Sequence, residues 1–208
     1  MLAASSRFLL FGAITALAVL LGVGVGTYVL SPKGPAIDGG TMLPQPRPVV
    51  DFKLTGEDGK PYTDADLKGH WTIVFAGYTH CPDVCPTTLQ TLKAVKADLG
   101  ADAGKLGVLF ISVDPARDTP ETLGHYVHFF GPDFRGATGS DEQLEALGKN
   151  LGFVFVKVPG PTPDSYTMDH SAALMLINPQ AQLAGYLLPP FDAQTIAKDM
   201  KTLMDGAA

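Results

Sequence analysis

The sequence predicts an α/β domain with a central mixed sheet flanked by helices, preceded by an apolar N-terminal helix. Three observations support this. Buried-strand patterns alternate with amphipathic helix patterns over most of the chain, a Pro- and Gly-rich segment precedes them, and a long uncharged stretch comes first. We therefore divide the 208 residues into an anchor over 1–30, a linker over 31–48 and a folded domain over 49–208.

The first element is the uncharged run from Phe8 to Leu30, FLLFGAITALAVLLGVGVGTYVL. As a helix it would be about 34 Å long, enough to cross a hydrocarbon core of about 30 Å. A cleaved signal peptide is the alternative, although its apolar region normally spans only about 7–15 residues. Arg7 before the run and Lys33 after it favour a cytoplasmic N-terminus by a small margin. We expect a single-pass bacterial inner-membrane protein whose C-terminal domain lies in the periplasm.

The second element is the segment 31–48, SPKGPAIDGGTMLPQPRP, which is dense in Pro and Gly. This composition resists both helix and sheet. It therefore predicts an extended, semi-stiff tether between the membrane and the domain.

The folded domain alternates strands with helices. The expected strands are a strand–turn–strand unit in 49–63, buried strands at 70–78 and 107–114, a third sheet strand at 153–158, and a hairpin in 172–188 that turns at Asn178-Pro179. The expected helices are 83–100, one starting at Asp118 or Thr119, one between a Ser140 cap and a Gly152 stop, and one from Asp192 to about Met204. This is the element order of a thioredoxin-like fold. In such a fold the segment GYTHCPDVCPTTL lies at the carboxyl end of a central strand and at a helix N-terminus, a location typical of ligand and redox sites.

Charge and cysteine content exclude several classes of function. The net charge is −6 and no basic cluster is present, which argues against a nucleic-acid partner. Two cysteines are too few for a disulfide scaffold, so the pair must be interpreted from its local sequence.

The cysteine pair, Cys81 and Cys85, has a spacing that permits two states. Residues four apart in a helical turn have Cβ atoms about 5–6 Å apart, whereas a relaxed disulfide needs about 3.5–4.5 Å. Two thiolates on one metal ion would need less closure, and the spacing favours neither state strongly. A purely structural disulfide would contribute only about 2 kcal/mol. A helix N-terminus is expected to lower the thiol pKa values and make the pair reactive.

A metal at this pair needs a further ligand. Soft thiolates suit Cu(I) and Zn(II), but a structural zinc normally takes four ligands and no second cysteine pair exists. His80 is expected to point away from the thiols, and His125 and His128 fit an ordinary helix face. His170 is the remaining candidate, because it precedes a strand in the loop that should lie over the cysteine turn; a capped loop histidine is the alternative. Asp169 could orient its ring. Met168 is expected to be a packing residue, and a transient ligand of the metal is the alternative.

Three segments together resemble the Sco/SenC family of membrane-anchored, thioredoxin-like copper proteins: GYTHCPDVCPTTL, SVDPARDTPETL and YTMDHSAALMLINP. The resemblance covers roughly Val49 to the C-terminus. It implies copper, as Cu(I) with Cu(II) left open, held by Cys81, Cys85 and His170. Asp83 matches an acidic position without an assigned role, and Asp114 is expected near the site.

The resemblance implies a copper chaperone that delivers the metal to the binuclear copper centre of cytochrome c oxidase. Its partners would be the copper-centre subunit of the oxidase and a periplasmic copper chaperone or thiol reductase. The alternative is a thiol-disulfide oxidoreductase that reduces the acceptor's cysteines, with Cys81 and Cys85 as the redox-active pair. A peroxidase ranks third, supported by thiolate reactivity alone.

Overall fold

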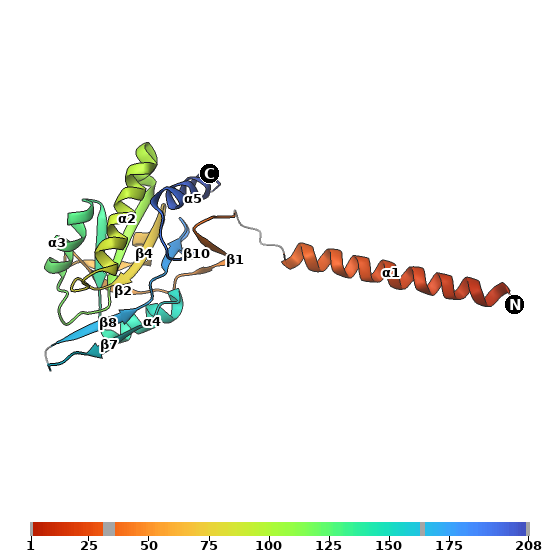
Figure 1. Ribbon diagram of the computed structural model, residues 1–208, viewed down its shortest axis with the longest axis horizontal. Helices are drawn as coiled ribbons and strands as arrows, with labels where there is room; N and C mark the ends of the chain where they lie inside the picture. Colours follow the sequence, from red (N-terminus) through yellow and green to blue (C-terminus); the bar gives the residue numbers. More distant parts are fainter. Residues whose placement is uncertain (1, 31–35, 163–164, 207–208) are drawn as a thin grey trace. The chain divides into compact units, whose positions relative to one another are not determined.

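The computed structural model describes residues 2–30, 36–162 and 165–206 (Figure 1). The chain separates into two compact units, Met1–Lys33 and Gly34–Ala208. The first unit contains the single helix α1, Leu2–Leu30. Among the residues described, no helix combines the length and apolar character needed to cross a membrane. The membrane anchor therefore stays a prediction.

The second unit is built on an eight-stranded mixed sheet with the strand order β1-β10-β9-β4-β5-β6-β2-β3. Its strands are β1 Gly40–Pro48, β2 Lys53–Gly56, β3 Pro61–Thr63, β4 Trp71–Gly77, β5 Leu106–Ser112, β6 Phe134–Thr138, β9 Leu174–Ile177 and β10 Gln182–Leu187. The three strands β4, β5 and β6 run parallel, and β9 pairs antiparallel with β4. The helices are α2 Val84–Leu99, α3 Pro120–Phe130, α4 Asp141–Leu151 and α5 Ala193–Asp205. The predicted thioredoxin-like α/β architecture has this mixed central sheet and these flanking helices.

The elements form where local sequence favours them. All seven residues of β4 are buried, as a central strand with covered faces requires. Helix α3 begins after Thr119, whose side chain accepts a hydrogen bond from the Thr122 N–H, with Pro120 in its first turn. Helix α4 has a Ser140 capping box and ends at Gly152, which has a left-handed backbone with φ 81°. The predicted helix boundaries are confirmed at these positions.

The linker prediction was wrong for Gly40–Pro48. This segment forms β1, which pairs antiparallel with β10 at one edge of the sheet. Proline is tolerated there because an edge strand leaves one side of its backbone without a ladder. The buried Asp199 carboxylate holds the start of the strand by accepting the backbone N–H groups of Asp38 and Gly39 at 2.9 and 2.7 Å. Residues 31–35 of the predicted linker lie outside the described residues.

The third parallel strand also differs from the prediction. Residues 134–138, FRGAT, form β6, although this short sequence containing Arg and Gly lacks a buried-strand pattern. The predicted sheet strand at 153–158 is instead β7 (Phe155–Pro159), which pairs with β8 (Tyr166–His170) in a separate two-stranded ribbon. Figure 1 shows this ribbon along one side of the domain. His170 therefore ends a strand and does not belong to a free loop.

Candidate metal centre

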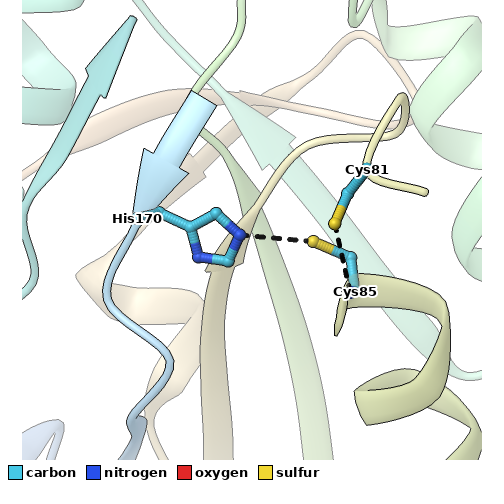
Figure 2. A group of neighbouring side chains, drawn as sticks. All are labelled: Cys81, Cys85 and His170. Carbon is cyan, nitrogen blue, oxygen red and sulfur yellow. Dashed lines mark hydrogen bonds between the residues drawn. The ribbon is translucent and has the colours of Figure 1, made fainter. Parts of the chain in front are cut away.

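Cys81, Cys85 and His170 converge in the folded domain (Figure 2). Both sulfurs and a ring nitrogen of His170 lie within 4.8 Å of one another. Cys85 Sγ and His170 Nε2 lie 3.4 Å apart. The Cys85 backbone N–H points at Cys81 Sγ from 3.3 Å, and both cysteines are free thiols. The structure thus brings together all three residues expected from the sequence, while their role as metal ligands stays a prediction.

The cysteine turn connects the carboxyl end of β4 to the first turn of α2. Cys85 is fully buried, whereas Cys81 is partly exposed. Gly77, the last residue of β4, leaves the space that the inner sulfur occupies. A Cβ there would lie 2.8 Å from Cys85 Sγ and 2.7 Å from Phe110 Cε2, closer than carbon atoms can pack. Sequence reasoning missed this glycine, although a glycine ending an otherwise apolar strand before a cysteine turn is a usable signal.

Burial controls the acidity of the inner thiol. It raises the pKa of Cys85 far above that of an ordinary cysteine, and the negative groups nearby, including Asp118, raise this pKa further. The expectation that the helix N-terminus lowers this pKa was wrong for Cys85, because desolvation of the fully buried sulfur raises the pKa by more than the hydrogen bond from the Tyr78 backbone lowers it. A bound metal ion would reverse the balance, since coordination supplies the positive charge that a buried thiolate lacks.

The imidazole of His170 enters the site from the end of β8. Its Nε2 faces Cys85, and its Nδ1 lies 3.1 Å from the backbone carbonyl oxygen of Ser171. With the proton on Nδ1 donated to that carbonyl, the Nε2 lone pair is directed at the thiols. The rings of Phe75 and Tyr78 meet the imidazole edge-on, with centroids 5.8 and 6.1 Å away.

Several residues considered from the sequence have other environments. Asp169 is exposed and the Ser171 carbonyl contacts the ring instead, so the orienting role expected for Asp169 was wrong. Met168 is buried in the core, as a packing residue should be. Among the described residues the cluster of possible ligands does not include His80, which is exposed and contacts Thr79, nor His125 and His128, which lie on α3. Asp83 is exposed at the start of α2, and its closest polar contact is with Thr87.

Comparison with known proteins identifies the family. The SCO1/SenC family model matches residues 41–205, which is most of the chain and includes all three converging side chains. The chain belongs to the SCO1/SenC family. The match begins inside β1, which agrees with β1 being part of the folded domain.

Individual relatives cover this same region. Bradyrhizobium japonicum ScoI, solved with copper bound, is 38% identical, with a TM-score of 0.68 over 74% of this chain and 98% of that one. Yeast Sco1, also solved with copper bound, is 30% identical, with a TM-score of 0.70 over 77% of this chain and 90% of that one. The mitochondrial SCO2 homologue of Bos taurus is 35% identical over 74% of this chain. The aligned region covers 59% of that relative's length.

The donor set favours a soft metal ion. Two sulfurs and one imidazole nitrogen are ligands that Cu(I) prefers over harder divalent ions such as Mg²⁺ or Ca²⁺. A structural zinc site normally has four protein ligands, and the cluster within the described part of the chain offers three. Because Cys81 is partly exposed, a ligand from another molecule could reach the metal on that side.

Proposed function

We propose that this protein is a copper chaperone that binds copper through Cys81, Cys85 and His170 and passes it to the binuclear copper centre of cytochrome c oxidase. The observation that carries the proposal is the convergence of two thiols and an imidazole within 4.8 Å, from segments far apart in the sequence. Family membership and the copper-bound structures of ScoI and Sco1 support copper as the metal. Cu(I) is the state that this ligand set suits best.

Transfer by ligand exchange follows from the uneven burial of the ligands. An acceptor thiol approaching from the side of Cys81 can coordinate the metal before the buried Cys85 releases it. The cargo then never enters bulk solvent. Oxidation of the two thiols to a disulfide removes both sulfur ligands, so metal binding depends on the redox state of the pair.

The second candidate function is thiol-disulfide exchange with the acceptor's cysteines. It is favoured by the presence of two free thiols side by side, one of them accessible from solvent. In this function Cys81 attacks the acceptor disulfide and Cys85 resolves the mixed disulfide, leaving a reduced acceptor and an oxidised pair here. His170 has no required role in that reaction.

Localisation is part of the proposal. The uncharged run from Phe8 to Leu30 supports a single membrane-spanning anchor in the bacterial inner membrane, with the folded unit in the periplasm. An anchor would raise the effective concentration of the site near a membrane-embedded acceptor. Labelling an introduced single cysteine in 49–208 with a membrane-impermeant thiol reagent, in a chain whose native cysteines are serine, tests this orientation in intact spheroplasts.

The decisive experiment is a Cu(I) titration of the reduced full-length protein against a coloured Cu(I) chelator. We expect one copper per chain, with X-ray absorption showing two sulfurs and one nitrogen around it. The His170→Ala variant should bind about tenfold to a thousandfold more weakly and lose the nitrogen neighbour. His125→Ala, an exposed histidine on α3, is the matched control and should bind like the wild type.

The two functions predict opposite roles for His170. Exchange with an oxidised acceptor peptide that continues unchanged in His170→Ala, together with unchanged copper affinity, would contradict copper delivery and favour the oxidoreductase. Loss of copper binding with exchange retained would assign His170 to the metal alone.

A further inference from the structure

The segment SVDPARDTP joins β5 to α3 and contributes none of the three proposed ligands, yet it contains two buried carboxylates. Asp118 has no exposed surface and Asp114 is 3% exposed. Carboxylates are rarely buried this completely unless they are bound by several donors. The donors that bind Asp118 lie on the cysteine side of the proposed metal centre, and those that bind Asp114 lie on the histidine side.

Asp118 contacts the cysteine side. Its carboxylate accepts the Thr79 N–H at 2.9 Å and the Thr79 hydroxyl at 2.6 Å. It also accepts the Ser112 hydroxyl at 2.5 Å, from the end of β5. Thr79 lies two residues before Cys81, so Asp118 connects the turn carrying the outer thiol to the neighbouring strand.

Arg117 contacts the histidine side. It is paired with the buried Asp114, and its Nη1 donates to the Tyr166 carbonyl oxygen at 3.2 Å. Its guanidinium also stacks on the Tyr166 ring, 3.7 Å from the centroid. The Tyr166 hydroxyl donates to Asp114 at 2.8 Å, which closes the connection. Tyr166 begins β8 and His170 ends it, so this contact fixes the strand that carries the imidazole.

The same guanidinium lies 5.7 Å from the Tyr78 ring centroid, and the Tyr78 ring meets the imidazole of His170 edge-on. Arg117 thus reaches the histidine by two routes, along the backbone of β8 and through an aromatic ring that follows β4. The ribbon itself is a two-stranded pair, which is marginally stable without outside contacts.

We propose that Arg117 and Asp118 are positioning residues that hold the two halves of the metal centre in register from one loop. Asp118 sets the position of the Cys81 turn, and Arg117 sets the position of His170. Because the two residues are adjacent in sequence, a shift of this loop would move both halves together. The inference rests on the proposed function, since it takes the three converging residues as the metal ligands.

Cu(I) affinity in a double-mutant cycle tests whether Arg117 positions His170. Arg117→Met should lower Cu(I) affinity about tenfold to a hundredfold, the range expected for residues that orient metal ligands. In a His170→Ala background the same change should lower affinity less than threefold, because the group that Arg117 positions is already absent. Arg117→Lys keeps the positive charge but lacks the forked guanidinium, so its Cu(I) affinity should lie between those of the wild type and Arg117→Met.

The contact of Asp118 with the Cys81 turn should behave differently in the same cycle. Asp118→Asn and the milder Thr79→Val should lower Cu(I) affinity by a similar factor in the wild-type and His170→Ala backgrounds. Thr79→Ser retains the hydroxyl and should restore wild-type affinity. If Asp118→Asn does not fold, Thr79→Val and Thr79→Ser test whether the contact between Asp118 and Thr79 positions the Cys81 turn.

A metal-free measurement keeps the inference separate from the proposed function. In the reduced apoprotein, amide hydrogen exchange at Thr79 should accelerate at least tenfold in Asp118→Asn and stay unchanged in Arg117→Met. Nuclear Overhauser contacts between the His170 and Tyr78 rings should weaken in Arg117→Met alone. Equal effects of both variants on both halves, or an Arg117→Met penalty that persists undiminished in His170→Ala, would overturn the inference. Failure of the wild type to bind Cu(I) would instead overturn the proposed function. The apoprotein measurements would still test whether Asp118 and Arg117 each position one half of the site.

Discussion

The two halves of the candidate metal centre, the cysteine turn and the end of β8, are held by very different parts of the domain. The cysteine half lies where β4 ends and α2 begins, and Cys85 is packed into the core beside Phe110. The histidine half is the end of β8 in a two-stranded ribbon whose outer strand, β7, is mostly exposed. One half belongs to a fully buried strand of the sheet, and the other to a separate two-stranded ribbon.

This difference suits the proposed function, in which the site both holds and releases copper. Thiols fixed by the core keep their spacing when the metal leaves, so the apoprotein stays ready to bind. An imidazole on a marginally stable ribbon can separate from the sulfurs without unfolding the sheet, since local openings occur where few apolar contacts are buried. Release of the His170 ligand is therefore the step that should cost least.

The largest expected effect comes from breaking the core under the cysteine half. Phe110 lies in β5 with no exposed surface, and its ring packs against Phe75 and Tyr126. Phe110→Ala should lower the free energy of unfolding by about 3–5 kcal/mol, from lost burial and the cavity left behind. Urea unfolding followed by circular dichroism measures this.

Phe129 is the matched control for that change, because it is 76% exposed on α3. Phe129→Ala should alter the free energy of unfolding by less than about 0.5 kcal/mol. Similar losses for the two phenylalanines would mean that the cysteine half does not depend on the core as described.

A further effect is expected at moderately alkaline pH, from the buried thiol of the cysteine half. Burial raises the pKa of Cys85 above its value in the unfolded chain. Its contribution to stability is therefore complete below the unfolded pKa, about 8.5, and is lost as the pH rises toward the folded value. For the reduced, metal-free protein, the free energy of unfolding should fall by up to about 1.4 kcal/mol per pH unit above this point.

Comparing the wild type with Cys85→Ser between about pH 8 and 9.5 isolates this slope, because tyrosines in an unfolded chain titrate only near pH 10. The serine variant should lose the steep part of the decline. A wild-type slope that matches that of Cys85→Ser would show that the inner thiol is not desolvated in the folded state.

The same contrast explains which features the sequence could predict. The buried strands 70–78 and 107–114 and the capped helices have patterns set by local burial and turn chemistry, and they formed close to where they were expected. The cysteine pair stands out because the sequence has no other cysteine, whereas His170 was singled out by its expected place over the cysteine turn and by the resemblance to the Sco/SenC family. Strand β6, by contrast, has too few apolar residues to be recognised and forms because β5 and β2 provide partners on both sides.

Three features of the site depend on tertiary contacts that no local pattern encodes. The raised pKa of Cys85 results from burial that the helix N-terminus alone would not suggest. The Ser171 carbonyl takes the contact expected for Asp169, because the end of β8 directs the ring toward the backbone. The pairing of β7 with β8 depends on a register between distant residues, so residues 153–158 were placed in the wrong sheet.

The ribbon itself allows a comparison of its two strands. Met168 on β8 and Val156 on β7 belong to the same two-stranded pair, but they are 8% and 58% exposed. Met168→Ala should lower the free energy of unfolding by about 2 kcal/mol or more, while Val156→Ala should change it by less than about 0.5 kcal/mol. Urea unfolding compares the two variants directly.

Cu(I) affinity should follow the same order. Met168→Ala removes the side chain that ties β8 to the core two residues before His170, and it should weaken binding several-fold. Val156→Ala should leave affinity unchanged. If both variants lose stability equally, the outer strand is anchored as firmly as the inner one, and an easily released imidazole can no longer explain how the metal leaves.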